Sequence, residues 1–290
     1  MTAERAHPIL VIGATGRVGR LVVDELVSAR MPVRALSRRP DLAELPADVD
    51  VVTGDLTVPG SLEAALNGVE TVFLVWTAPP ATVPAVIERL VSHARRVVLL
   101  SSPHQTPHPF FQQPNAMARF HADLERHIAA SGLGSTIIRP GMFASNTQFW
   151  WGAMLRGGDV VRWPYGAAET APIDERDIAA VAARALCDER HVGGDYMLTG
   201  PQSLSQIEQV AIIGDELGRA IRFEELSPEE FRGETAGIWP TAAVDMLMAA
   251  WQATIGHKAF ITSTVLDVLG SPPRTFRQWA ADHTAAFSAR

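Results

Sequence analysis

The stretch that decides the fold runs from Pro8 to Gly19 and reads PILVIGATGRVG. Its first half is a continuous apolar run that ends in glycine, which is typical of a buried parallel strand. Apolar residues at Val18, Leu21 and Val22 then repeat with the spacing of one helix face. The three glycines of this stretch therefore stand at a turn between a strand and a helix.

This glycine-rich turn has the spacing of a dinucleotide-binding loop. Gly13 permits the tight turn, Gly16 lets the backbone approach a pyrophosphate, and Gly19 lets the helix pack close to the strand. The start of the helix offers phosphates its unpaired N–H groups and the positive end of its dipole. A turn without a ligand is the alternative, but the order of strand, turn and helix favours the dinucleotide site. The loop residues predicted to bind it are Gly13, Thr15, Gly16, Arg17, Val18 and Gly19.

The end of the next expected strand indicates which dinucleotide is bound. An NAD site places a carboxylate on the ribose 2′-hydroxyl about 20 residues after the glycines. Here the strand runs into Arg38 and Arg39, and the first carboxylate is Asp41. Two arginines can pair with a 2′-phosphate, which a carboxylate would repel, and Arg17 could join them. These residues predict NADP(H), with NAD(H) as a second possibility, whereas a solvated turn is the alternative.

Strand-like and helical segments alternate through the first half of the chain, which predicts a parallel sheet covered on both faces. The further expected strands are residues 33–36, 49–53, 71–76, 97–101 and 136–138, and the helices between them are 61–67, 83–94 and 115–130.

The alternation stops after Pro140, although a helix at 174–186 and a strand at 195–198 are expected to return to the sheet. We predict an α/β fold with two parts. Residues 1–142, with 170–200 returning to them, form a doubly wound Rossmann core. Residues 143–169 and 201–290 form a smaller, mostly helical substrate-binding lobe.

Composition narrows the class of protein. The 290 residues carry a formal net charge of −7, which argues against a nucleic-acid binder. The single cysteine, Cys187, excludes an intrachain disulfide and a thiolate metal cluster, and its helical apolar setting predicts a buried thiol.

His104 and His108 have helical metal-pair spacing, but prolines interrupt the segment, so no metal is expected. No apolar run has membrane-spanning length, so we expect a cytoplasmic monomer or weak homodimer that contacts neither membrane nor nucleic acid.

Four stretches, taken in order, resemble the NmrA-like group of atypical short-chain dehydrogenase/reductases. They are VIGATGRVG at 11–19, GDL at 54–56, VLLSS at 98–102 and IRPG at 138–141. The resemblance covers the first two-thirds of the chain. It implies an adenine flanked by Asp55 and Leu56, a nicotinamide-side ribose flanked by Val75, Trp76 and Thr77, and a nicotinamide beside Ser101 and Ser102.

The chain departs from this family at the catalytic pair. Most relatives that catalyse redox chemistry use Tyr-x-x-x-Lys, but neither Tyr165 nor Tyr196 has a lysine four residues on. Aligning the expected helix on Glu125 puts Met117 at the tyrosine position and His121 at the lysine position. The usual proton donor is therefore absent.

Two hypotheses of different class account for this absence. In the first, the protein is a reductase, and a substrate hydroxyl, water, Ser101 or His121 delivers the proton. The loss of a general acid costs about two to four orders of magnitude, which a reactive substrate can tolerate. In the second, the protein binds NADP(H) without turnover and reports redox state to a partner protein.

An aromatic stretch after residue 141 favours the reductase. It follows the carboxyl end of a sheet strand, where α/β proteins bind ligands, and flat aromatic walls suit a polycyclic or quinone substrate. Packing between lobe and sheet is the alternative for these side chains. The predicted substrate pocket consists of Ser102, His104, Met117, Phe143, Trp150 and Trp163.

The sequence thus predicts an NADPH-dependent reductase of a carbonyl or quinone in an aromatic, polycyclic small molecule. A chain that lacks the standard catalytic pair and has such a pocket is similar to the angucyclinone-type polyketide ketoreductases. A simple quinone or dye reductase is the alternative enzyme.

Overall fold

A computed structural model describes residues 7–113 and 115–288, which divide into two compact units. The first unit contains residues up to 102, 117–140 and 175–196, and the second contains 103–116, 141–174 and the chain from 197 onward. The sequence prediction had assigned 103–116 to the Rossmann core. This loop instead bonds within the second unit, where His108 Nε2 lies 2.9 Å from the carbonyl oxygen of Lys258.

A seven-stranded sheet with the order β3-β2-β1-β4-β5-β6-β9 forms the centre of the first unit. The pairs from β3 to β6 are all parallel, as predicted. The strands are β1 (Ile9–Ile12), β2 (Val33–Ser37), β3 (Asp50–Thr53), β4 (Thr71–Val75), β5 (Arg96–Leu100), β6 (Gly134–Pro140) and β9 (Asp195–Leu198).

The register brings the carboxyl ends of the central strands to one edge of this sheet. Ile12 lies opposite both Leu36 and Leu74, and Val75 lies opposite Leu100. The strand order reverses between β1 and β4, which is the switch point where α/β sheets bind ligands. The glycine loop after β1 begins at this point.

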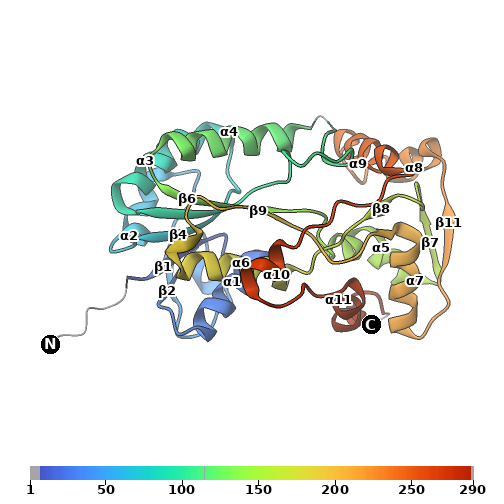
Figure 1. Cartoon of the computed structure of the whole chain (residues 1–290), viewed down its shortest axis with the longest axis horizontal. Helices are drawn as coiled ribbons and strands as arrows, with labels where there is room; N and C mark the ends of the chain where they lie inside the picture. Colours follow the sequence, from blue (N-terminus) through green and yellow to red (C-terminus); the bar gives the residue numbers. More distant parts are fainter. Residues whose placement is uncertain (1–6, 114, 289–290) are drawn as a thin grey trace. The chain divides into compact units, whose positions relative to one another are not determined.

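Helices cover both faces of the sheet, so the fold is the expected doubly wound Rossmann type. Figure 1 shows α3 (Val83–His93) and α4 (Ala116–Ala130) along one face, and α1 (Arg17–Ser28) and α6 (Glu175–Cys187) along the other. The short α2 (Glu63–Leu66) follows a 3₁₀ turn at Pro59–Leu62, where the sequence predicted one longer helix. Cys187, expected to be buried, is exposed because it is the last residue of α6.

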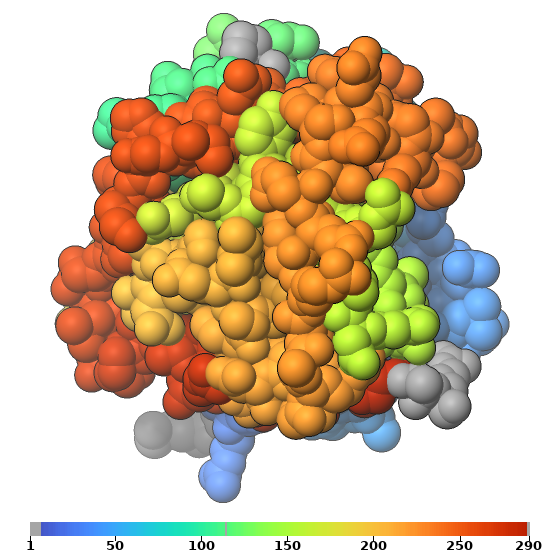
Figure 2. All heavy atoms as spheres, turned by 90° about the vertical axis from the view of Figure 1, so that its right-hand side faces the viewer, coloured from blue at the N-terminus to red at the C-terminus, as the bar shows by residue number. Residues whose placement is uncertain are grey.

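The second unit is built mainly from helices and two small sheets. Its elements are α5 (Asn146–Gly157), β7 (Val160–Trp163), β8 (Glu169–Thr170), β10 (Leu204–Ser205), α7 (Gln206–Leu217), β11 (Arg222–Glu225), α8 (Pro228–Thr235), α9 (Thr241–Thr254), α10 (Thr264–Leu269) and α11 (Phe276–Asp282). Figure 2 shows the amber and orange segments around α7 and β11 packed closely across one face of this unit. The parallel pairing of β11 with β7, about 60 residues apart, was not predicted.

Capping boxes set where three of these helices begin. Ser205 caps α7, Ser227 caps α8 and Thr275 caps α11, and each accepts a hydrogen bond from a backbone N–H of the first turn. A Glu or Gln of the first turn accepts in return from the backbone N–H of the capping residue. Within residues 7–113 and 115–288, no helix combines the length and apolarity needed to cross a bilayer.

The aromatic side chains of the second unit form its core. Trp163 is 1% exposed and lies against the rings of Trp150, Trp151 and Trp251 at centroid distances of 5.6–6.3 Å. Phe231 closes the cluster at 4.7 Å from Trp163. Burying large rings against each other stabilises a core strongly, which is the alternative that the sequence left open. Trp150 and Trp163 thus both pack in this core, and their place in the wall of a substrate pocket stays a prediction.

Candidate functional site

The loop after β1 requires glycine at two of its three glycine positions. Gly13 has a φ of +90°, and a Cβ there would lie 2.8 Å from the Cβ of Val75. A Cβ on Gly19 would lie 2.1 Å from the carbonyl oxygen of Gly13. Gly16 donates its N–H to that same oxygen at 2.9 Å, which closes the turn. The loop therefore brings bare backbone to the switch point of the sheet.

The first turn of α1 leaves its N–H groups available to an anion. Gly16 is the N-cap in extended conformation, and no side chain caps it within the described part of the chain. The first turn also carries no acidic residue, while Thr15 and Arg17 are exposed beside it. Uncapped N–H groups and the positive helix end together form a phosphate site. The side chain of Val18 is 5% exposed and packs in the core, so only the backbone of this residue can contact a ligand.

A cationic cavity of about 280 Å³ lies beside this loop. Arg38 and Arg39 line it from the end of β2, as the 2′-phosphate prediction requires, and Arg20 joins them from α1. Arg20 donates to the carbonyl oxygen of Glu44 at 2.6 Å, which fixes its direction. Sequence reasoning missed Arg20, although its position four residues after Gly16 places it one turn into the helix. The full lining is Thr15, Arg20, Ser37, Arg38, Arg39 and Leu42.

Asp55 lies near this cavity at the end of β3. The backbone N–H of Thr57 donates to its carboxylate at 2.8 Å, and this bond is the main reason that the pKa of Asp55 is lowered. The charge of Arg38 lowers that pKa further. Leu56 is 3% exposed and packs in the core, and its place beside the adenine, which the resemblance implied, stays a prediction.

The residues after β4 lie at the same sheet edge. Thr77 is exposed and Val75 is half-buried, so both can face a ligand. Trp76 is mostly buried, and its indole N–H donates to the carbonyl oxygen of Ala78 at 2.7 Å. Its ring lies 6.3 Å from that of Phe120 on α4. Trp76 therefore supports the edge rather than offering a free hydrogen-bond donor.

These features fit a dinucleotide. A Cβ would fill the cradle formed by Gly13 and Gly19, the uncapped turn of α1 suits a pyrophosphate, and three guanidinium groups surround the adjoining cavity. A bound nicotinamide dinucleotide would supply a hydride. The chain's own contribution to such chemistry must then come from groups at the ends of β4 and β5.

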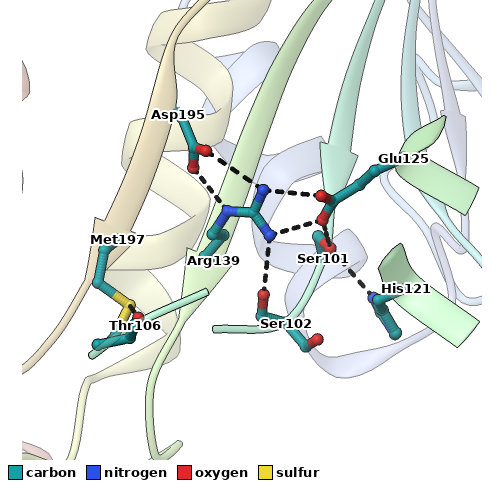
Figure 3. Close-up of polar contacts among 8 residues, drawn as sticks. All are labelled: Ser101, Ser102, Thr106, His121, Glu125, Arg139, Asp195 and Met197. Carbon is teal, nitrogen blue, oxygen red and sulfur yellow. Dashed lines mark hydrogen bonds and ion pairs between the residues drawn. The ribbon is translucent and has the colours of Figure 1, made fainter. Parts of the chain in front are cut away.

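Such groups exist at the end of β5. Ser101 is 7% exposed, and its hydroxyl donates to a carboxylate oxygen of Glu125. The same hydroxyl lies 3.3 Å from Nδ1 of His121, one helical turn before Glu125 on α4 (Figure 3). The structure thus brings together Ser101 and His121, the two residues that the sequence predicted as catalytic. Their link through Glu125 was not predicted, because Glu125 served there only to align the helix.

A buried arginine holds Glu125 in place. The guanidinium of Arg139, 4% exposed on β6, binds both oxygens of Glu125 at 2.6 and 2.7 Å and binds Asp195 at 2.6 Å (Figure 3). Burial alone would lower the pKa of Arg139, but its hydrogen bonds to Asp195 and Glu125 outweigh burial and raise that pKa. Arg139 also donates to the carbonyl oxygen of Ser102 at 3.2 Å. The end of β5 is therefore anchored by a charged network.

The remaining predicted pocket residues divide between the two units. In the first unit, Ser102 is half-buried beside Arg139 and Met117 is 58% exposed on α4. In the second, His104 and Phe143 are half-buried. That unit also has a small cavity of about 10 Å³, the space of one water molecule. Its lining includes Phe110, Phe111, Met142, Glu169 and Phe260, none of which the sequence singled out as pocket residues.

Comparison with known proteins agrees with this geometry. A family model described as NAD(P)H-binding matches residues 13–189. The chain is 37% identical over 287 residues to a (4-alkanoyl-5-oxo-2,5-dihydrofuran-3-yl)methyl phosphate reductase of Streptomyces griseus, covering 97% of this chain and 99% of that protein. It is 32% identical over 289 residues to an NAD(P)H azoreductase of Xenophilus azovorans, covering 97% and 99%.

Two solved structures share the fold. An NADPH-dependent quinone oxidoreductase of Escherichia coli in complex with NADPH superposes with a TM-score of 0.80, at 23% identity over 94% of this chain and 99% of that one. A triphenylmethane reductase of Citrobacter gives a TM-score of 0.80, at 19% identity over 96% and 99%. The family model spans more than half of the chain, and the glycine loop that it includes has the geometry of a phosphate site. The chain therefore belongs to the NAD(P)H-binding family.

Proposed function

We propose that this protein is an NADPH-dependent reductase that transfers hydride to a conjugated acceptor in a small cyclic or aromatic molecule. The single observation that carries the cofactor choice is the cavity lined by Arg20, Arg38 and Arg39 beside the glycine loop. Each guanidinium can pair with the negative charge and the several acceptor oxygens of a phosphate, whereas a ribose 2′-hydroxyl is neutral and has a single oxygen. NADPH is therefore favoured over NADH.

The names of three relatives point to one class of acceptor. They describe reductases of an unsaturated furanone phosphate, of azo compounds and of quinones, the last in a protein of Escherichia coli that is 25% identical to this chain. In each case the electron-accepting bond is conjugated. Hydride addition to such a bond leaves a negative charge that is delocalised over several atoms.

The missing tyrosine supports this class of acceptor. An isolated ketone gains a localised alkoxide on hydride transfer, so it needs a strong proton donor nearby. Met117, at the tyrosine position, cannot donate a proton and is 58% exposed. A conjugated acceptor requires less help, because its anion is delocalised and needs no donor bound to it during hydride transfer, so that it can be protonated afterwards. An aromatic ketone next to a phenol, as in a polycyclic polyketide, belongs to the same class because the phenol can donate.

An acceptor panel tests this proposal. Purified protein would be mixed with NADPH and, in turn, a quinone, an azo dye, a conjugated lactone, a phenol-flanked polycyclic ketone and a simple cyclic ketone, and NADPH absorbance would be followed. We expect turnover with one or more conjugated acceptors and none with the simple ketone. Preferred turnover of the simple ketone would refute the conjugated class. Tight NADPH binding with no turnover on any acceptor would instead identify a non-catalytic redox sensor, which the absent catalytic pair also allows.

A further inference from the structure

The carboxylate of Glu125 lies where it can control the proton on His121. Its side chain is 11% exposed, and its Oε1 accepts hydrogen bonds from both Ser101 and Arg139. Ser101 in turn lies between Glu125 and the His121 ring (Figure 3). We propose that Glu125 is a positioning residue that holds a proton on His121 through the hydroxyl of Ser101, and that His121 donates this proton to the reduced acceptor. The donor role rests on the proposed reductase function.

The direction of each hydrogen bond follows from the groups involved. An ionised carboxylate only accepts, so the single hydroxyl proton of Ser101 points to Glu125. The oxygen of Ser101 then has only lone pairs left for His121, so Nδ1 of His121 must carry a hydrogen. When the ring is protonated, its second N–H is at Nε2, on the edge opposite Ser101. Nε2 is therefore the atom from which a proton can leave.

The charged groups linked to the ring through Ser101 carry a net negative charge. Glu125 lies one turn further along the same helix, and the hydroxyl of Ser101 contacts both side chains. Arg139 from β6 binds Glu125, and Asp195 from β9 binds Arg139 in turn. These three groups sum to one negative charge, two carboxylates against one guanidinium. Negative charge near a histidine raises its pKa, and Ser101 links the nearer carboxylate directly to the ring.

The proton step balances with hydride transfer. Once the acceptor has received hydride, its oxygen or nitrogen takes the proton from Nε2 of His121. The N–H bond breaks with its electron pair left on the ring, and an O–H or N–H bond forms on the product. The neutral ring then regains a proton from water. One hydride and one proton are consumed for each acceptor reduced.

The test is an NMR titration of the His121 ring in the cofactor-free protein, with the signal assigned by its loss in His121→Gln. Glu125→Gln keeps the shape of the side chain and removes its charge, and we expect the pKa of His121 to fall by about one unit. Asp195→Asn is the matched control. It removes an equal charge from the same arginine without a contact to Ser101, so its shift should be clearly smaller. In reduction assays, the alkaline limb of the pH profile should move with Glu125→Gln by the same amount.

Three outcomes decide the proposal. If Glu125→Gln folds and leaves the pKa of His121 unchanged, the proposal is wrong. If Glu125→Gln lowers that pKa as much in a Ser101→Ala background as alone, the coupling does not pass through Ser101 and the proposal is also wrong. If Glu125→Gln does not fold, Ser101→Ala alone must lower the pKa of His121. Because the titration needs no turnover, a protein that shows the coupling but reduces no acceptor would refute the proposed function instead.

Discussion

Replacing Arg38 and Arg39 with alanine isolates the charge that selects the cofactor. Both guanidinium groups are exposed and line the cavity beside the glycine loop. Among residues 7–113 and 115–288, no carboxylate forms an ion pair with Arg39, so its charge is available to a ligand. Charge-assisted hydrogen bonds contribute roughly 1.5–3 kcal/mol each, and exposure favours the lower end of that range. Two such bonds give about 3 kcal/mol, which corresponds to about a 100-fold weaker Kd.

Fluorescence titration with NADPH and NADH measures this effect. We expect the double variant to bind NADPH about 100-fold more weakly and to bind NADH within about threefold of the wild type. Arg20 remains in the cavity, so NADPH binding should not vanish. Arg95→Ala, which removes an 80% exposed arginine just before β5 at the opposite sheet edge, should change neither affinity. Equal losses for both cofactors in a folded double variant would refute the assignment, because a 2′-phosphate contact cannot affect NADH.

Three further substitutions probe the loop, the aromatic core and the titration of Asp55. Gly19→Ala should weaken the binding of NADPH and of NADH alike by about tenfold or more in the same titration, because its Cβ would lie 2.1 Å from the carbonyl oxygen of Gly13. Unchanged affinities would mean that the loop does not hold the cofactor. Trp163→Ala should lower the free energy of unfolding, measured in urea, by about 3–5 kcal/mol. Phe149→Ala, at a 67% exposed position, should lower it by only about 0.5 kcal/mol. Similar losses for the two variants would mean that Trp163 does not belong to the core. The pKa of Asp55 is lower in the folded protein, so its stabilisation is present above its ordinary value of 3.8 and is lost as pH falls through the folded value. As the pH is lowered below 3.8, the melting temperature of the wild type should therefore fall more steeply than that of Asp55→Asn. Parallel curves of melting temperature against pH would contradict this.

The two units differ in how well the sequence predicts them, for a physical reason. In the first unit, the inner strands β1 and β4 are short apolar runs buried on both faces, so their pattern is local, and β9 has the predicted bounds at 195–198. In the second unit, β7 pairs with β11 from about 60 residues away. The aromatic residues of α5 also gave no clear helical periodicity. Non-local pairing and a mixed pattern leave no signal in a short window of sequence.

The candidate site shows the same limit at the level of single residues. The glycines and the two arginines after β2 could be identified because their roles depend on spacing along the chain. The network of Ser101, Glu125 and Arg139 depends on three elements meeting at one point, since the residues come from β5, α4 and β6. Nothing in the sequence indicates that a carboxylate on α4 faces an arginine on β6. The exposed side of the site was therefore predicted better than its buried support.

The exchange of the catalytic pair follows one electrostatic rule. A general acid works best when its pKa lies near the operating pH. Tyrosine has an ordinary pKa of about 10, so a nearby cation such as lysine is needed to lower it. Histidine starts at about 6.5, so a nearby anion moves its pKa upward into the neutral range. In our proposal, His121 takes the lysine position of α4, and the carboxylate of Glu125 acts on it through Ser101, whose hydroxyl contacts both side chains. We infer that a change in the donor from phenol to imidazole requires a change in the sign of the supporting charge, and Arg139 holds that carboxylate in position through two hydrogen bonds.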